Sequence, residues 1–272
     1  MERWEWRQAG ELRYLVLPGW EERGVLAAVS TRRGGVSRGD FASLNLALHV
    51  GDDPRAVRHN RRRWAQALGI EAGHLVCARQ VHGARAAVVG EQHRGMGVWE
   101  EESACPDCDV MLTDARGVYL MMCFADCIPV LLFDPVRRAV GLAHCGWKGT
   151  LEGAAAVAVQ AMQRQLGCVP GRMRAFIGPG IGGCCYQVGA EVVARAMGVF
   201  GDSSPVLRRG AGGVCMDLVL ANRLLLERAG VPPANVAAAG LCTACLPDLL
   251  YSYRRAGGRT GRFGVTLGLQ PG

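Results

Sequence analysis

VYLMMCFADCIPVLLFDPVRRAVGLAHC, residues 118–145, is the stretch of sequence that decides the fold. Its apolar runs have the length of strands rather than of helices, and turn residues separate them. We predict strands over 118–124, 128–133 and 139–143, with another ahead of them over 110–112.

Helices are predicted on both sides of these strands. Asp52-Asp53-Pro54 is typical of a helix start, with an aspartate cap and a proline in the first turn, and Gly69 is typical of its end. Further helices are predicted over 150–166 and 217–229, and a further strand over 174–177. Because helices and strands alternate too irregularly for a doubly wound parallel sheet, the sequence predicts a mixed α+β fold.

Length and composition indicate a folded protein. A chain of 272 residues allows one large domain or two fused halves. Half of the residues are hydrophobic, and the 38 glycines are scattered through turns rather than gathered into a repeat. No low-complexity linker divides the chain.

The sequence predicts a cytosolic protein with no membrane partner. The longest apolar stretch, 118–133, is broken by Asp126 and Pro129 and falls short of the ~20 residues that a membrane helix needs. Residues 1–7 carry acidic side chains and lack the hydrophobic core of a signal peptide. The 12 cysteines are therefore expected to be reduced core residues, ligands or reactive thiols.

The formal net charge of +7 comes from 31 basic and 24 acidic residues, with Lys148 as the single lysine. Such use of arginine reflects a genome's compositional bias and says little about partners. The run Arg61-Arg62-Arg63 lies in a predicted helix and lacks interleaved aromatic residues, so we predict a solvated face and no nucleic-acid partner. An anionic small substrate suits the charge equally well.

Three short segments each contain a good zinc ligand: Gln80-Val81-His82, Asp126-Cys127 and His144-Cys145. If they converge, one thiolate and two imidazoles form a three-ligand site with an open fourth position, which is typical of catalytic zinc. His144 is predicted at a strand end just before a helix, where backbone N–H groups attract anions. Spacing alone does not establish convergence, because taken singly His82 is more typical of a structural histidine and Cys127 of a buried core residue.

Further short motifs occur in order along the chain. They are Thr31-Arg32-Arg33-Gly34-Gly35-Val36-Ser37, Ser43-Leu44-Asn45-Leu46, His49-Val50-Gly51-Asp52-Asp53, Gln80-Val81-His82-Gly83, Ala125-Asp126-Cys127-Ile128-Pro129-Val130, Ala143-His144-Cys145-Gly146-Trp147, Ile177-Gly178-Pro179, Cys184-Cys185-Tyr186 and Ser252-Tyr253-Arg254-Arg255. With these motifs the chain resembles the YfiH-like proteins over nearly its whole length. That family was once described as multicopper polyphenol oxidases or laccases and is now described as purine nucleoside phosphorylases with adenosine deaminase activity.

The resemblance implies a single domain over residues 1–272 with a layered α/β/β/α fold, mixed sheets and two related halves. It also implies that His82, Cys127 and His144 together bind zinc. The implied substrates are purine nucleosides such as adenosine, inosine and methylthioadenosine, with phosphate as the co-substrate. The oligomeric state is left open.

The resemblance and the chemistry together suggest residues for phosphorolysis. A phosphate dianion must be held near C1′ of the ribose, and Lys148, the helix start near Thr150 and Arg33 are candidates for that task. Lys148 stands where the family usually has arginine, so it keeps the charge but loses the forked donors. Arg33 is alternatively solvated. Ser43 and Asn45 are candidates for contacts to ribose hydroxyls, although Asn45 can equally cap a local turn.

Deamination of adenosine needs a water that attacks C6 and an acid that protonates the departing ammonia. Asp126, next to Cys127, is the candidate proton carrier. Its alternative role is to accept a hydrogen bond from a histidine ligand and orient it.

Two Cys-x-x-Cys pairs, Cys105/Cys108 and Cys242/Cys245, have no assigned role. Four thiols can build a closed structural zinc site, but the gap between the pairs far exceeds zinc-ribbon spacing. Neither pair follows a strand and opens a helix as in thioredoxin. The loop 178–183 is interpreted as a tight turn, because no Lys-Ser or Lys-Thr follows it as in a phosphate-binding loop.

Three alternatives to the nucleoside enzyme remain at the level of sequence. A copper oxidase of phenols needs more histidines than His49, His59, His74 and His93 supply in so dispersed a pattern, so zinc is favoured over copper. An enzyme that edits peptidoglycan precursors would use the same metal site, and this role is also attached to bacterial members of the family. A non-enzymatic, metal-stabilised binding protein would show a closed fourth coordination position.

Overall fold

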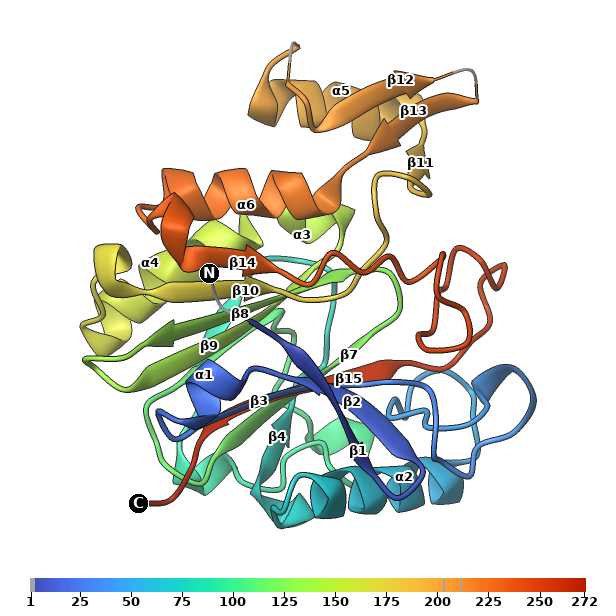
Figure 1. Cartoon of the computed structure of the whole chain (residues 1–272), viewed down its shortest axis with the longest axis vertical. Coiled ribbons are helices and arrows are strands. Elements are labelled where there is room, and N and C mark those ends of the chain that lie inside the picture. The colour runs from blue at the N-terminus through green and yellow to red at the C-terminus, as the bar shows by residue number, and fades with distance from the viewer. Residues whose placement is uncertain (1–2, 203, 211) are drawn as a thin grey trace.

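The structure is a computed structural model that describes residues 3–202, 204–210 and 212–272. Two six-stranded mixed sheets lie face to face, and helices cover their outer faces (Figure 1). The first sheet has the order β1 (Glu5–Ala9), β2 (Leu12–Val16), β3 (Val25–Ser30), β15 (Phe263–Leu269), β7 (Tyr119–Phe124) and β4 (Leu75–Cys77). The second has the order β14 (Val236–Ala238), β10 (Arg174–Ile177), β8 (Ile128–Asp134), β9 (Ala139–Cys145), β6 (Val110–Thr113) and β5 (Ala86–Val88).

The two sheets share a pattern of strand directions. Each has one edge strand in a parallel pair, β4 with β7 and β5 with β6, followed by three antiparallel pairs. They differ at the opposite edge, where β1 is antiparallel to β2 and β14 is parallel to β10. The related halves of the predicted fold are visible in this common order of directions.

Helices close the outer face of each sheet. Helix α2 (Pro54–Ala67) packs on the first sheet, where its Trp64 joins Tyr14, Leu75 and Met121 in one cluster. Helices α3 (Trp147–Leu151), α4 (Ala154–Leu166) and α6 (Leu218–Arg228) cover the second sheet. A short helix α1 (Pro18–Glu21) precedes β3, and a projecting unit combines α5 (Ala190–Phe200) with β11 (Gln187–Val188), β12 (Leu207–Gly210) and β13 (Gly213–Met216).

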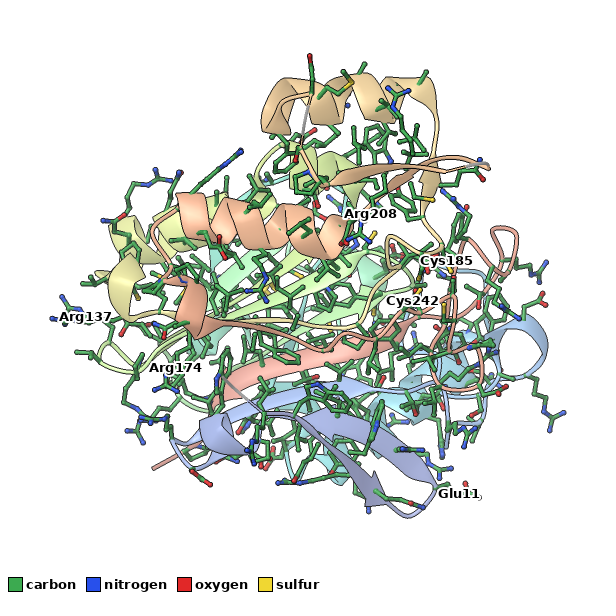
Figure 2. The ribbon with its side chains drawn as sticks, turned by 45° about the horizontal axis from the view of Figure 1, so that its top comes forward. Glu11, Arg137, Arg174, Cys185, Arg208 and Cys242 are labelled. Atoms are coloured by element: carbon green, nitrogen blue, oxygen red, sulfur yellow. The ribbon has the colours of Figure 1, made fainter. Side chains whose placement is uncertain are left out.

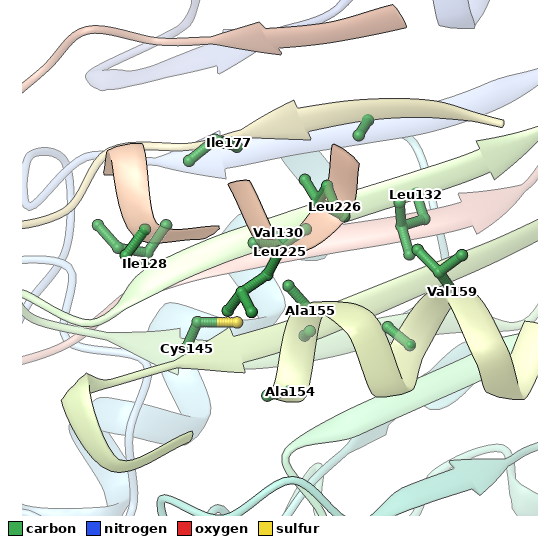
Figure 3. Close-up of a cluster of buried hydrophobic side chains, with 14 of the residues drawn as sticks. Ile128, Val130, Leu132, Cys145, Ala154, Ala155, Val159, Ile177, Leu225 and Leu226 are labelled. Atoms are coloured by element: carbon green, nitrogen blue, oxygen red, sulfur yellow. The ribbon is translucent and has the colours of Figure 1, made fainter. Parts of the chain in front are cut away.

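The central strands are apolar throughout because both of their faces are covered. Val130 and Cys145 pack toward the helices together with Ala155 and Leu225 (Figure 3). Alternate residues such as Leu131 point into the core between the sheets. The predicted α/β/β/α layering and α+β class are confirmed. The single domain over residues 1–272 stays a prediction.

The predicted strands agree with β6, β7, β8, β9 and β10 to within about two residues. The helix predicted over 150–166 is instead divided into α3 and α4. The break lies at Gly153, whose φ of +83° is a left-handed conformation that a continuous helix does not contain. Helix α3 therefore begins at Trp147 rather than near Thr150, and Thr150 is buried.

The prediction of a solvated arginine face on α2 is wrong for Arg61. This side chain is 4% exposed, and its guanidinium donates to the backbone carbonyls of Leu46, Gly97 and Val98. Arg62, in contrast, is exposed. In residues 3–202, 204–210 and 212–272, no helix combines the length and apolarity needed to cross a bilayer.

Candidate metal centre

His82, Cys127 and His144 lie together at one end of the core between the two sheets. Their ligand atoms lie within 4.8 Å of one another. Cys127 immediately precedes β8 and His144 is the penultimate residue of β9, and the antiparallel register of these strands brings the two ends together. His82 comes from the loop after β4, and its ring centroid is 4.9 Å from that of His144. The convergence that spacing alone did not establish is thus produced by sheet register.

Asp109 organises both histidines. Its carboxylate accepts the backbone N–H groups of Val81, His82 and Gly83 at 2.8–3.1 Å, which fixes the loop that carries His82. The same carboxylate lies 2.7 Å from Nδ1 of His144. Because Nδ1 is engaged in this way, Nε2 of His144 is left to face Cys127, as in metal ligands oriented by a carboxylate.

Two further contacts shape the centre. The side chain of Gln80 forms two hydrogen bonds with the backbone of Cys123, so the His82 loop is fastened to the end of β7. Gly146 follows β9, and a Cβ atom at this position would lie 2.9 Å from Sγ of Cys127 and 3.3 Å from His82. Only glycine leaves the ligand side chains their room here.

The charges of the three residues are coupled. Burial by itself raises the pKa of the Cys127 thiol, but the charge of His144 and hydrogen bonds from His144 and His82 lower that pKa to about 6. Burial by itself lowers the pKa of His144, whereas Cys127 and Asp109 raise it to about 9. Both pKa shifts favour a thiolate on Cys127 beside an imidazolium on His144, and a divalent cation would bind in exchange for the imidazolium proton.

A cleft of about 520 Å³ opens beside the three ligands. This volume is in the range of small-molecule sites. Besides the ligands, the cleft is lined by His49, Gln80, Cys123, Ala125, Asp126, Gly146, Trp147, Ile181, Tyr186, Tyr253, Arg254 and Arg262. Aromatic and cationic side chains thus share one concave surface with a candidate metal centre.

Asp126 lies in this cleft, 8% exposed. Its φ of +92° is rare for a residue with a side chain, and two hydrogen bonds hold its carboxylate. Thr243 Oγ1 donates to Oδ1 and the backbone N–H of Arg254 donates to Oδ2, both at 2.6 Å. The carboxylate that orients a histidine is Asp109, so the alternative role suggested for Asp126 is filled by another residue.

Comparison with known proteins points to one family. Residues 26–270 match the family described as multi-copper polyphenol oxidoreductase laccase. The purine nucleoside phosphorylase YlmD of Geobacillus stearothermophilus is 42% identical over 247 residues, which are 90% of each chain. The adenosine deaminase RL5 of an unknown prokaryotic organism is 37% identical and covers 86% of this chain and 90% of its own. The crystal structure of YlmD from Geobacillus stearothermophilus superposes with a TM-score of 0.93 at 39% identity, covering 98% of this chain and 99% of that one.

The chain belongs to the YfiH family. The resemblance inferred from its motifs is therefore confirmed, and its relatives carry the names of enzymes. The family's description names a copper oxidase, whereas the relatives' names describe a phosphorylase and a deaminase, so the two imply different reactions. The side chains of this chain that could bind a metal can be compared with the needs of each reaction.

Two nitrogen ligands, one thiolate and an open side suit a catalytic zinc ion. A multicopper oxidase would in addition need a histidine-rich cluster. Among the described residues, two groups of three or more His, Cys, Asp or Glu side chains come close enough to share an ion. One is His82, Cys127 and His144, and the other consists of cysteines alone. The remaining histidines are dispersed: His49 lines the cleft, His59 is exposed, His74 contacts Glu71 and His93 accepts the N–H of Gly90. The histidines of this member of the YfiH family fit one mononuclear centre.

The two basic residues suggested for phosphate lie elsewhere. Lys148 is exposed and its ammonium group lies 5.6 Å from the ring centroid of Trp147, outside the described lining of the cleft. Arg33 is exposed, lies outside the lining of the cleft and donates from Nε to the backbone carbonyl of Asp248. Neither placement supports the predicted role. Thr150 is also turned away, because its Oγ1 faces Cys145 and Asn222. The helix itself begins at Trp147, which lines the cleft, so an anion site at the helix start stays a prediction.

Ser43 and Asn45 serve the fold of the first sheet's loops. Ser43 Oγ donates to the carbonyl of Arg32 and accepts the N–H of Gly35. Asn45 is fully buried, donates to Ala47 O and Asp52 Oδ2, and accepts the N–H groups of Ala47 and Arg262. Its local turn role, which the sequence left open, accounts for all of these bonds. Its contact to ribose stays a prediction without support from its position.

The two Cys-x-x-Cys pairs lie apart in the structure, and each has its own neighbours. Cys105 and Cys108 contact each other, with 3.4 Å between their sulfur atoms, and both are buried. Cys242 and Cys245 lie instead beside Cys184 and Cys185. The closed site that was considered from Cys105, Cys108, Cys242 and Cys245 is therefore not formed.

Several residues of the centre escaped sequence reasoning. Asp109 is a fully buried carboxylate directly ahead of strand β6, and its place as an acid at the edge of an apolar run is the signal that could have identified it. Tyr186, Tyr253 and Arg254 occur in motifs quoted for the family resemblance, but their sequence gives no sign that they share a cleft. Arg262 carries no local signal at all.

Proposed function

We propose that this chain is a zinc-dependent purine nucleoside phosphorylase that also deaminates adenosine at the same centre. In phosphorolysis, phosphate replaces the purine at C1′ and yields ribose 1-phosphate and the free base. In deamination, water replaces the amino group at C6 and yields inosine and ammonia. One observation carries the proposal: the His-Cys-His centre, aromatic rings and guanidinium groups all line the same cleft.

The aromatic side chains suit the flat base of the nucleoside. Trp147, Tyr186 and Tyr253 line the cleft, and Tyr253 is 50% exposed, so its ring is available to a ligand. Tyr186 is held by the guanidinium of Arg254, which lies 5.0 Å from its ring centroid. A purine between such rings gains stacking and apolar contact.

The cations suit phosphate. Arg254 and Arg262 line the same cleft, which places two guanidinium groups where Lys148 and Arg33 had been expected to act. Arg254 donates from Nη1 to the carbonyl of Gln187, and Arg262 donates to the carbonyls of Thr260 and Gly261. Each guanidinium keeps further N–H groups for a dianion, because it has five donors in all.

His82, Cys127 and His144 would hold the zinc ion. When bound, zinc acts as a Lewis acid that polarises an oxygen atom and lowers the pKa of a water molecule. The carboxylate of Asp126, beside Cys127 and inside the cleft, is positioned to hold or move a proton between water and the departing group. Thr243 and the backbone of Arg254 prevent that carboxylate from rotating away.

The test is incubation of metal-quantified protein with inosine and adenosine, with and without phosphate, followed by separation of bases and nucleosides. We expect release of free base only with phosphate, and inosine from adenosine without it. If neither reaction occurs and a peptidoglycan precursor is turned over instead, the proposal is wrong and the protein is an enzyme that edits such precursors.

A pair of variants checks the phosphate site. Arg254→Gln is expected to raise KM for phosphate about tenfold or more, since a charge-assisted hydrogen bond is worth about 1.5–3 kcal/mol. Arg259→Gln is the matched control, because Arg259 is an exposed arginine of the same loop that pairs with Asp40 outside the cleft. Equal effects of the two substitutions would contradict a phosphate site at Arg254.

A further inference from the structure

A second cluster of metal ligands lies outside the centre described above. Cys184 and Cys185 belong to the loop before β11, and Cys242 and Cys245 to the loop after β14. The four sulfur atoms lie within 4.8 Å of one another. Figure 2 shows Cys185 and Cys242 on the same side of the molecule, where the two loops meet.

The sulfur separations match four ligands of one ion. Sγ of Cys245 lies 3.4 Å from Sγ of Cys185 and 3.7 Å from Sγ of Cys184. A tetrahedral zinc ion with Zn–S bonds of about 2.3 Å separates its sulfur ligands by roughly 3.8 Å. A disulfide would require about 2.05 Å. We propose that Cys184, Cys185, Cys242 and Cys245 bind a second, structural zinc ion.

The backbone forms a cradle for these thiolates. The N–H of Gly182 points at Sγ of Cys242 with an N···S distance of 3.2 Å, which stabilises negative charge on that sulfur. A Cβ atom on Gly182 would lie 3.1 Å from Sγ of Cys184 and 3.3 Å from Cβ of Cys242, so the turn depends on glycine. Adjacent cysteines differ from the usual Cys-x₂₋₄-Cys spacing of zinc sites, and this turn is what lets both face Cys245.

The two loops are joined independently of the thiols. The N–H of Gly180 donates to the carbonyl of Leu241, and the carbonyl of Gly180 accepts the N–H of Thr243. Gly180 and Cys242 form an isolated parallel β-bridge. The ligands therefore face one another from backbone that is already paired, which lowers the entropy cost of assembling the site.

Charge balance also favours a cation at this place. Four thiolates on one Zn²⁺ leave a net charge of −2. Two arginines form hydrogen bonds with the same loops. Arg255 donates to the carbonyl of Ala244, which lies between Cys242 and Cys245 in the sequence. Arg254 donates to the carbonyl of Gln187, two residues after Cys185. Two positive charges are thus attached to the loops that carry the four ligands. Since the protein supplies all four ligands, this ion has no open position and its role is structural.

The cluster supports the walls of the cleft. Tyr186, which lines the cleft, directly follows Cys185. Thr243, which fixes Asp126, directly follows Cys242. A metal that joins Cys185 to Cys242 thus holds the aromatic wall and the carboxylate of the cleft in one relative position.

The experiment is metal analysis of the full chain, purified anaerobically and freed of loosely bound ions. We expect two zinc ions per chain in the unaltered protein and one in Cys245→Ser, with the centre at Cys127 still loaded. Cys215→Ser is the matched control, a half-buried cysteine of β13 outside both clusters, and should keep two. The proposal is overturned if the unaltered protein holds one zinc ion that Cys127→Ser removes.

A second measurement needs no substitution. Cys184 and Cys245 are exposed, so as free thiols they would react rapidly with maleimide. We expect both to be protected until a zinc chelator is added, as mapped by mass spectrometry of the labelled peptides. Immediate labelling of the zinc-loaded protein, or disulfide-linked peptides in place of free thiols, contradicts the proposal. Neither readout depends on catalytic activity, so failure here is distinguishable from failure of the proposed function.

Discussion

The two metal-ligand clusters differ in composition, support and surroundings. The His82–Cys127–His144 centre mixes nitrogen and sulfur, combines two strand ends with one loop and opens onto a cleft of about 520 Å³. The four-cysteine cluster contains sulfur only, lies on two loops and has two exposed members. Ligand number decides what each can do: three protein ligands leave a position for a reacting oxygen, whereas four leave none.

The clusters are also linked. Thr243 follows a ligand of the four-cysteine cluster and bonds to Asp126, which precedes a ligand of the His-Cys-His centre. We therefore predict that the reaction takes place at the His-Cys-His centre and that the four-cysteine cluster positions the residues of the cleft. Thr243 and Asp126 connect the two.

Cys127→Ala is expected to have the largest effect. It removes the thiolate of the His-Cys-His centre, and metal-ion catalysis worth several kcal/mol corresponds to a loss of on the order of 10³-fold in turnover. Metal content should fall by the ion of this centre alone. Cys145→Ala, which changes a buried cysteine that is not a ligand, is the control. Full activity in Cys127→Ala would contradict the assignment of the reaction to the His-Cys-His centre.

Asp109→Asn should weaken the same centre without emptying the other. Loss of a carboxylate that orients a metal-bound histidine typically costs about 10–100-fold in metal affinity. Asparagine also turns an amide N–H₂ toward the backbone N–H groups that Asp109 accepts. Competition with a chelator of known affinity measures the change. An unaltered affinity would show that Asp109 supports only the loop.

Thr243→Val probes the link between the clusters. The hydroxyl donates to Asp126 at 2.6 Å in a buried position, and loss of one such bond is worth about 1 kcal/mol, or about fivefold. We expect kcat to fall by about that factor while both metal contents stay unchanged. Thr260→Val, whose hydroxyl makes only a 3.5 Å contact to Asp40 O, is the control. A loss of zinc from either cluster would assign Thr243 a role in ligation instead.

Lys148→Arg should have the smallest effect. Lys148 follows His144 closely in sequence, but its side chain is exposed and lies outside the described lining of the cleft. We expect less than about a twofold change in kcat and in KM for phosphate, because exposed surface substitutions are usually close to neutral. A tenfold decrease in KM for phosphate would extend the phosphate site beyond Arg254 and Arg262.

Local sequence predicted the elements of the fold well where one pattern dominated. Apolar runs of strand length gave β6 to β10 nearly to the residue, and the Asp53-Pro54 cap gave the start of α2. It failed at Gly153 and at Arg61. In the first case a glycine in a left-handed conformation divides a helical pattern, and in the second an arginine satisfies three carbonyls from elsewhere in the chain.

By itself, the sequence determined the α+β class and the ordered motifs that mark the family. Through that resemblance it also implied His82, Cys127 and His144 as a set of metal ligands. Only the tertiary structure decided which groups act together. Strand register joins Cys127 to His144, Asp109 binds both histidines, and Cys242 meets Cys185 rather than Cys105. Periodicity and capping act between near neighbours in the chain, whereas a metal site depends on distances between residues that only the packing of sheets and loops brings together.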